Sequence, residues 1–370
     1  MPTKNSFLKH GFFIFAFCVL LSARIAAQSE KIINQAFQPL VEDKSHVGIV
    51  VGLIDKNGRK IYDYGDSGKA NLKLDGDTIF EIGSITKVFT TLLLAEMSER
   101  GEVSVTDAVN LYLPRGVKLP QFAEREITLL DLATHTSGLP EFPSNLKPKD
   151  ESNPLADYST AAMYDFLSKY KLKRNIGSEY EYSSLGMGLL GHVLALKAGM
   201  SYEDLLTKRI SQSLGLKDTR ITLDASSQTR LAKGYDEKGK PIANWDLPTL
   251  AGAGALRSTA NDMLNFLVAN LDPSKTNLAA VLENAQVARH RAKSQKNPMF
   301  VALGWHVLNY KGEEIVWHDG GTGGYTSIVC FNRKHRVGLV VLSNSAESDD
   351  NSVLSRVGLQ TLIKIISEKK

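Results

Sequence analysis

Strand-forming segments lie near both ends of this 370-residue chain, and a long helical stretch separates them. Near the start, residues 48–54 and 60–64 are strand-like and flank Asn57-Gly58, a pair typical of tight hairpin turns. Near the end are three β-branched, apolar runs: residues 314–318, 325–332 and 336–343. Strands so far apart in sequence share one core only if both ends of the chain meet. We therefore predict one antiparallel sheet assembled from both termini.

The stretch between these strands has the spacing of apolar residues that is typical of helices. In residues 84–100, apolar side chains recur every three or four positions, and Gly101 ends the pattern. Four more segments are predicted to be helical: residues 31–40, 185–198, 261–270 and 351–366. Residues 139–154 are polar and rich in proline, which predicts a loop.

Together these patterns predict an α/β (α+β) fold, with helices flanking the sheet and an all-helical region inserted. We expect the sheet region over about 28–83 and 300–370, and the mostly helical region over about 84–299. Binding and catalytic sites often form where two such regions meet, so we expect the site at this boundary.

Residues 1–27 are expected to be a secretory signal peptide. Two lysines and a histidine precede an apolar run over residues 11–21, and Ala26-Ala27 follow it. This run is shorter than the ~18 residues that span a bilayer. We therefore expect cleavage, a mature chain over 28–370 without a stable membrane span, and a periplasmic or secreted location. A retained N-terminal anchor is the alternative.

The net charge of +4 belongs mostly to the leader, which contains three basic residues and no acidic one. The remaining chain has no long basic run with interleaved aromatic residues, so we expect no nucleic-acid partner. Cys330 is the only cysteine after the leader, which excludes an internal disulfide in the mature chain. Because no Cys-x-x-Cys or His-Glu-x-x-His motif is present, we expect no metal and no cofactor.

Ser84 and Lys87 form a Ser-x-x-Lys motif at the start of the predicted helix 84–100. The same spacing recurs at four other serines, Ser6, Ser144, Ser168 and Ser367, but none of these opens a long apolar helix. At a helix start the serine N–H lacks an intrahelical acceptor and can face an oxyanion. Lys87 lies on the same face, where burial would disfavour its charged form. The alternative is a helix cap followed by a solvated lysine.

Two other segments are candidates for the site. Tyr182 lies at a predicted helix start, where a nearby cation would suit its phenol to acid–base catalysis; half-buried packing is the alternative. His318 opens the densest glycine cluster of the chain, residues 318–324, directly after a predicted strand. Glycines permit close approach of a substrate, and the histidine can donate to an anion. A flexible hairpin turn is the alternative reading of this cluster.

In their order along the chain, these segments resemble the class C β-lactamase superfamily, which includes penicillin-binding-protein-like DD-carboxypeptidases and carboxylesterases. The resemblance covers about residues 78–344. Beyond the three motifs, three more segments look like family landmarks in the same order: residues 130–140, 255–263 and 303–305. Six ordered segments are far more specific than any one motif. The resemblance implies a β-lactamase/transpeptidase-like fold.

The resemblance also implies a role for each candidate residue. Ser84 would attack a carbonyl carbon and form an acyl-enzyme. Lys87 and Tyr182 would share the transfer of the serine proton to the leaving nitrogen. The backbone N–H groups of Ser84 and Gly321 would form the oxyanion hole. His318 would lie across the cleft and help to bind a substrate carboxylate.

Two positions depart from the pattern of the family's β-lactamases. Ser184 stands where they usually have asparagine, two residues after the tyrosine, so its contact with a substrate amide is expected to be weaker or rearranged. Their Lys-Thr-Gly is replaced by His318-Asp319-Gly320, and DD-carboxypeptidases and several esterase-like members carry histidine there. Asp319 adds a negative charge where a carboxylate is expected to bind.

The sequence therefore predicts an exported serine hydrolase that acts on a small-molecule or peptide substrate. Hydrolysis of β-lactams and of D-alanyl peptides are both expected activities. A carboxylesterase of the same fold and a non-hydrolytic penicillin-binding sensor are the alternatives. The sensor is retained as an alternative because of Ser184.

Overall fold

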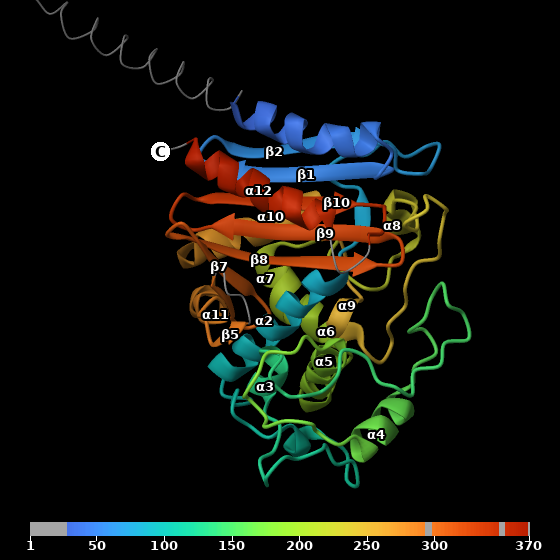
Figure 1. Ribbon diagram of the computed structural model, residues 1–370, viewed down its shortest axis with the longest axis vertical. Coiled ribbons are helices and arrows are strands. Elements are labelled where there is room, and N and C mark those ends of the chain that lie inside the picture. The colour runs from blue at the N-terminus through green and yellow to red at the C-terminus, as the bar shows by residue number, and fades with distance from the viewer. Residues whose placement is uncertain (1–27, 293–297, 348–351, 369–370) are drawn as a thin grey trace, which may run out of the picture.

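The computed structural model describes residues 28–292, 298–347 and 352–368. Within them, an antiparallel sheet of eight strands has the order β2-β1-β10-β9-β8-β7-β6-β5 (Figure 1). The strands are β1 (Gly48–Asp55), β2 (Gly58–Gly65), β5 (His290–Ala292), β6 (Met299–Val301), β7 (His306–Tyr310), β8 (Glu313–Thr322), β9 (Tyr325–Asn332) and β10 (Val337–Ser343). The N-terminal hairpin pairs directly with the last strand, for example Val51 opposite Val341. The prediction of one sheet built from both termini is confirmed.

Successive side chains of β1 point to opposite faces of the sheet, and both faces are covered, so the strand is apolar at nearly every position. Val50 faces one hydrophobic core, which also contains Leu264 and Leu267 of α10 (Ala260–Leu271). Ile49 and Val51 face a second core. That core lies under the helix over 28–42 and under α12 (Val353–Ser367). A strand with both faces covered by helices has no polar face, which explains its continuous apolar run.

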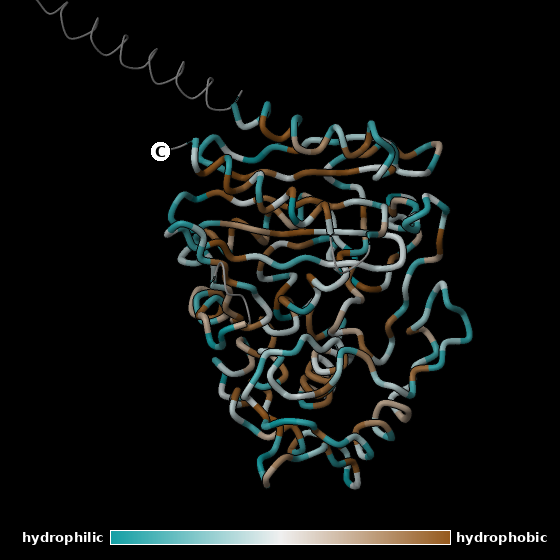
Figure 2. The backbone as a smooth tube through the Cα atoms, in the orientation of Figure 1, coloured by the Kyte–Doolittle hydropathy of each residue, from teal (hydrophilic) through white to brown (hydrophobic). Residues whose placement is uncertain are grey.

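The second half of the molecule is helical and lies below the sheet in Figure 1. Its α-helices are α2 (Thr86–Glu99), α3 (Leu129–Ala133), α4 (Thr160–Lys169), α5 (Ser184–Ala198), α6 (Tyr202–Leu206), α7 (Gln212–Leu214), α8 (Ala225–Arg230), α9 (Ala251–Gly254) and α11 (Ala279–Ala285). Shorter turns are η1 (Gly83–Ile85), η2 (Val109–Tyr112), the π-helical η3 (Thr207–Ser211) and η4 (Pro273–Lys275). Figure 2 shows hydrophobic residues along the strands and inner helices and hydrophilic ones mainly in the loops.

Helix α2 is the centre of the helical half. Every residue from Thr86 to Met97 is buried, because α2 packs against α5, α9 and α11 and meets the sheet at its N-terminus through η1. A helix buried on all sides presents no polar stripe, so a charged residue within it must find internal partners. Lys87 is such a residue.

The predicted elements recur with small changes. The predicted helices 185–198, 261–270 and 351–366 correspond to α5, α10 and α12, except that residue 351 lies outside the described residues. The segment 84–100 begins as the η1 turn rather than as α-helix, and Gly83 at the start of this turn has a left-handed φ of 49°. Two further strands, β3 (Ile79–Glu81) and β4 (Arg257–Thr259), pair beside η1, so the mostly helical stretch contributes the short strand β4 to a second, two-stranded sheet.

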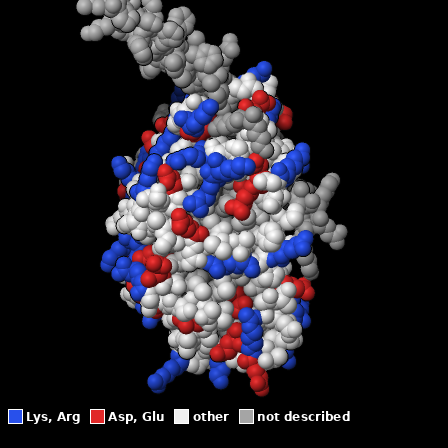
Figure 3. All heavy atoms as spheres, turned by 90° about the vertical axis from the view of Figure 1, so that its left-hand side faces the viewer, with Lys and Arg blue, Asp and Glu red and all other residues white. Residues whose placement is uncertain are grey.

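The described part of the chain contains no helix long and apolar enough to cross a membrane. On the face drawn in Figure 3, basic and acidic side chains are intermixed and separated by uncharged residues. Cys330 is fully buried in β9, where it packs in the core beneath α12 as a small apolar side chain.

Candidate active site

Ser84 lies in the η1 turn, between the small sheet β3–β4 and the buried helix α2. The turn is held from both sides, because the Ile82 N–H donates to the Leu256 carbonyl and the Ile85 N–H donates to the Ile82 carbonyl. The Leu256 N–H in turn donates to the Thr86 hydroxyl at 3.1 Å. These bonds place Ser84 at the surface of a cavity while the helix behind it stays buried.

Lys87 follows Ser84 by almost one helical turn, and the structure brings the two side chains together. The Lys87 Nζ donates to Ser84 Oγ at 2.7 Å and to the Ala253 carbonyl at 2.7 Å. The lysine is only 1% exposed. A lysine so deeply buried and bonded to a serine is poised for proton transfer rather than for solvent contact.

Tyr182 lies against the same pair, although about 95 residues separate it from Lys87 in sequence. The Lys87 Nζ lies 4.8 Å from the centre of the Tyr182 ring. Burial raises the pKa of Tyr182 well above its ordinary value, while a hydrogen bond with Ser84 opposes that rise. The phenol is therefore protonated at rest and touches the serine that we predicted as nucleophile. Ser84, Lys87 and Tyr182 form one constellation.

Glycines allow strand β8 to approach Ser84 closely. A side chain on Gly320 would overlap the Ile82 carbonyl oxygen and would lie 2.7 Å from the Ser84 nitrogen. A side chain on Gly83 would lie 2.7 Å from the Gly321 nitrogen. The backbone of Gly320 and Gly321 therefore lies against that of Gly83 and Ser84, and both Ser84 and Gly321 line the same cavity.

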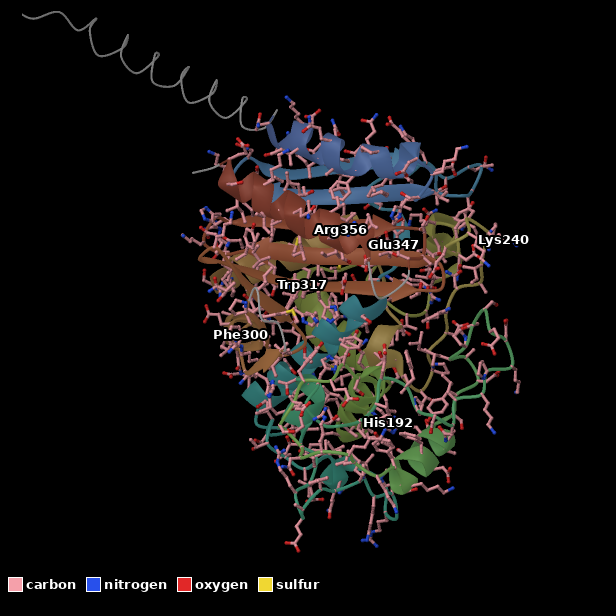
Figure 4. The ribbon with its side chains drawn as sticks, viewed as in Figure 1. His192, Lys240, Phe300, Trp317, Glu347 and Arg356 are labelled. Atoms are coloured by element: carbon pink, nitrogen blue, oxygen red, sulfur yellow. The ribbon has the colours of Figure 1, made fainter. Side chains whose placement is uncertain are left out.

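A cavity of about 740 Å³ opens over these groups. It is lined by Ser84, Lys87, Tyr182, Ser184 and Gly321, and also by Asp319, Glu141, Trp245, His306 and Trp317. Figure 4 labels two residues of its sheet side, Trp317 on β8 and Glu347 beyond β10. Such a volume and mixed lining suit a small-molecule or peptide substrate.

His318 differs from the other predicted site residues in its position. It is 1% exposed and does not line the cavity, whereas Asp319 does. Side chains alternate along a strand, so His318 points to the opposite face of β8 from Asp319. Its Nδ1 lies 2.5 Å from the Asp319 carbonyl oxygen, and burial lowers the pKa of His318 well below its ordinary value. The side chain of His318 is therefore neutral and enclosed within the protein.

Sequence reasoning did not identify two buried histidines beside this site, His135 and His306. His306 lies 5.1 Å from His318 and stacks on Trp317 at 4.9 Å, measured between ring centres. Burial lowers the pKa of His306 to about 4. His135 stacks on Tyr182 with ring centres 4.7 Å apart. Both histidines belong to or adjoin segments that look like family landmarks, 130–140 and 303–305, and that position was the available sign of their importance.

Among the residues that the structure describes, no three histidine, cysteine, aspartate or glutamate side chains gather so as to hold a metal ion.

Comparison with known proteins agrees with this architecture. A family model described as beta-lactamase matches residues 33–362. A β-lactamase of Pseudomonas fluorescens is 26% identical, over 86% of this chain and 94% of the relative. The D-alanyl-D-alanine-carboxypeptidase/endopeptidase AmpH of Escherichia coli K12 is 29% identical, over 80% of this chain and 78% of the relative. A crystal structure of a β-lactamase/D-alanine carboxypeptidase from Yersinia pestis has the same fold, with a TM-score of 0.79, 24% identity and coverage of 92% and 99% of the two chains.

The fold, the constellation and these relatives define a serine hydrolase. Because the family model spans most of the sequence, the chain belongs to the β-lactamase family. The resemblance inferred from six short segments is confirmed.

Proposed function

We propose that this protein hydrolyses β-lactams or D-alanyl peptides through an acyl-enzyme on Ser84. One observation carries the proposal: the buried Nζ of Lys87 lies 2.7 Å from the Oγ of Ser84, and Ser84 lines a cavity. A nucleophile and its proton partner within hydrogen-bond reach are the geometric signature of covalent catalysis. The relatives named β-lactamase and D-alanyl-D-alanine-carboxypeptidase support the choice of substrates.

The acylation step balances with the groups present. Ser84 Oγ forms a bond to the substrate carbonyl carbon while its proton passes to Lys87 in its uncharged form, either directly or through the Tyr182 hydroxyl, which gives up one proton as it takes another. The carbonyl oxygen becomes negative and is stabilised by the N–H groups of Ser84 and Gly321. When the C–N bond breaks, Lys87 or Tyr182 returns a proton to the leaving nitrogen. Water then attacks the ester, and the same groups carry the protons in reverse.

Intact-protein mass spectrometry after incubation with a penicillin tests the proposal. The expected result is a mass gain equal to the intact drug in the wild type and no gain in Ser84→Ala. Ser168→Ala is the matched control, because Ser168 also begins a Ser-x-x-Lys motif but is exposed and bonds only to the Asp165 carbonyl. A drug-sized adduct that persists in Ser84→Ala would refute Ser84 as the nucleophile.

Following the adduct over time separates hydrolase from sensor. A sensor would keep the adduct without turnover, whereas a hydrolase regenerates the free enzyme. If no adduct is seen, hydrolysis of the drug is assayed directly, since fast deacylation also hides an intermediate. An enzyme with neither adduct nor hydrolysis would exclude the β-lactam activity, and ester and D-amino-acid peptide substrates would then be assayed.

Two substrates distinguish the two main activities. Turnover of a chromogenic cephalosporin without cleavage of D-Ala-D-Ala peptides would favour a β-lactamase, and the reverse would favour a DD-peptidase. Ser184 lines the cavity at the start of α5 and offers one hydroxyl, whereas an asparagine offers both an amide donor and an acceptor. Its Ser184→Asn variant is expected to shift the ratio of the two activities.

We also infer export to the periplasm or the medium, from the pattern of residues 1–27. N-terminal sequencing of the protein from the producing cells provides the test. A mature N-terminus near residue 28 in the exported fraction is expected, and an intact leader on membrane-bound protein would instead support a retained anchor.

A further inference from the structure

His135 contacts the segment around Tyr182 at three points. Its carbonyl oxygen accepts a hydrogen bond from the Glu181 N–H at 2.8 Å. Its Nδ1 accepts one from the Ser183 N–H at 3.0 Å. Its ring stacks on the Tyr182 ring, with centres 4.7 Å apart and planes 28° apart. One residue therefore holds the backbone on both sides of the tyrosine and the tyrosine ring itself.

The backbone at His135 is unusual in a way that serves these contacts. It adopts a left-handed φ of 57° just after α3, a conformation that few residues other than glycine take. The preceding helix is anchored by a capping box between Thr128 and Asp131, and the Asp131 carbonyl accepts from the Thr136 N–H at 2.9 Å. Unfavourable backbone conformations persist where surrounding structure enforces them, often at functional sites.

The imidazole is fixed in one protonation state. The side chain is 1% exposed, and burial together with the nearby Lys87 lowers the pKa of His135 well below its ordinary value. Because Nδ1 accepts from Ser183, the hydrogen of the neutral ring is on Nε2. Nε2 has no hydrogen-bond partner among the described residues. A buried polar atom without a partner destabilises the folded state, so the packing of the core alone does not explain a histidine at this position.

We infer that His135 is a positioning residue that sets the location of the Tyr182 hydroxyl relative to Ser84 Oγ. This inference rests on the acid–base role proposed for Tyr182. It assigns His135 no contact with substrate, since His135 does not line the cavity. Misplacing a catalytic group by about 1 Å can lower a rate about a hundredfold.

Two substitutions separate the hydrogen bond from the ring. His135→Asn keeps an acceptor for the Ser183 N–H and suits the left-handed backbone, but it removes the ring. His135→Phe keeps an aromatic ring for stacking but removes the acceptor. His192→Phe is the matched control, because His192 also contacts a tyrosine, with its Nε2 2.5 Å from the Tyr164 hydroxyl, but is only partly buried and lies in α5 away from the cavity (Figure 4).

The measurement is the acylation rate at saturating substrate, per active site titrated with a fluorophosphonate, together with the substrate concentration that gives half of that rate. We expect His135→Phe to lower the maximal rate about tenfold to a hundredfold, with the half-saturating concentration changed less than about threefold. His135→Asn is expected to recover most of the lost rate. His192→Phe should match the wild type.

The outcomes separate this inference from the proposed function. If the wild type is neither labelled at Ser84 nor able to turn over any of the substrates, the proposed function fails. If the wild type acylates, and His135→Phe acylates at the same rate per titrated site, the positioning role of His135 is refuted. A His135→Phe variant that loses labelled sites but keeps its rate per site would refute it as well, because only folding is then affected. Circular dichroism spectra of all variants identify that case.

Discussion

The two walls of the cavity differ in how their groups are held. On the helical wall, Lys87 is buried and bonded twice, and Tyr182 is packed between neighbours that fix it. On the sheet wall, Asp319 and Gly321 are only partly buried, and glycines bring the backbone of β8 up to η1. The contrast supports the proposed division of roles, with covalent and proton-transfer chemistry on the helical wall. Charge stabilisation and substrate selection would then belong to the backbone and side chains of the sheet wall.

Replacing Lys87 tests the helical wall and should have the largest effect. Lys87→Met keeps a long side chain of similar volume but removes the Nζ that bonds to Ser84 Oγ and to the Ala253 carbonyl. We expect acylation to slow by a factor of about a thousand, within the range of a lost general acid–base group. Stopped-flow mixing with a chromogenic cephalosporin measures it.

Lys169→Met serves as the control for the same substitution on an exposed helix surface, where Lys169 pairs only with Asp165. It should leave the rate unchanged. A Lys87→Met rate within about tenfold of the wild type would contradict the division of roles, because general acid–base catalysis is worth more than that.

Substituting Gly320 tests the sheet wall. The new methyl group would meet two backbone atoms, the Ile82 oxygen and the Ser84 nitrogen, and neither can move without shifting η1. Gly320→Ala should therefore displace an oxyanion donor and lower kcat/KM about a hundredfold. Gly254→Ala in the same cavity is the control, because its methyl would come no closer than 3.4 Å to any atom. A Gly320→Ala enzyme within about threefold of the wild type would show that β8 does not set the oxyanion geometry.

Much of the fold follows from local patterns in the sequence. The strands at both ends and helices α5, α10 and α12 were predicted because apolar spacing, caps and turn residues act over a few neighbouring positions. The η1 turn before α2 was not predicted, since it depends on the close approach of Gly320 from β8. Tertiary contacts of this kind have no local counterpart in the sequence.

The candidate site shows the same limit. Ser84 and Lys87 lie within one helical turn, so their meeting could be predicted from spacing. The face of β8 toward which His318 points depends on the register of the sheet. Side chains alternate between the two faces of a strand, so a shift of one residue places a side chain on the opposite face. His135 could not be placed beside Tyr182 from local patterns, because 48 residues separate it from Ser183.

The dependence of stability on acidic pH should reveal the buried histidines in and beside the cavity. Burial lowers the pKa of His135, His306 and His318, in the case of His306 to about 4. The unfolded chain binds these protons near pH 6.5, so it holds more protons than the native state between about pH 6.5 and 4. The contribution of these histidines to the free energy of unfolding is therefore fully present above pH 6.5. It is lost as the pH drops below that value, by about 1.4 kcal/mol per pH unit for each histidine.

Denaturant unfolding at pH 7.5, 6.0 and 5.0 measures this dependence. In His306→Leu the slope between pH 6.0 and 5.0 should decrease by the contribution of one proton. An equal slope in wild type and His306→Leu would show that His306 is not held neutral.

The smallest expected effect concerns the charge on the sheet wall. Asp319 lines the cavity and lies close enough to Tyr182 for its charge to contribute to the raised pKa of that phenol. A substrate carboxylate bound beside Gly321 would meet this like charge in a partly solvated site, where such repulsion is modest. Asp319→Asn should therefore lower KM for carboxylate-bearing substrates about threefold to tenfold. It should leave a neutral ester unaffected, and the difference should shrink at high salt. Equal changes for charged and neutral substrates would mean that Asp319 acts through the shape of the cavity. In that case the selection of substrates by charge would have to be assigned to the acidic side chains on its other side, beginning with Glu141.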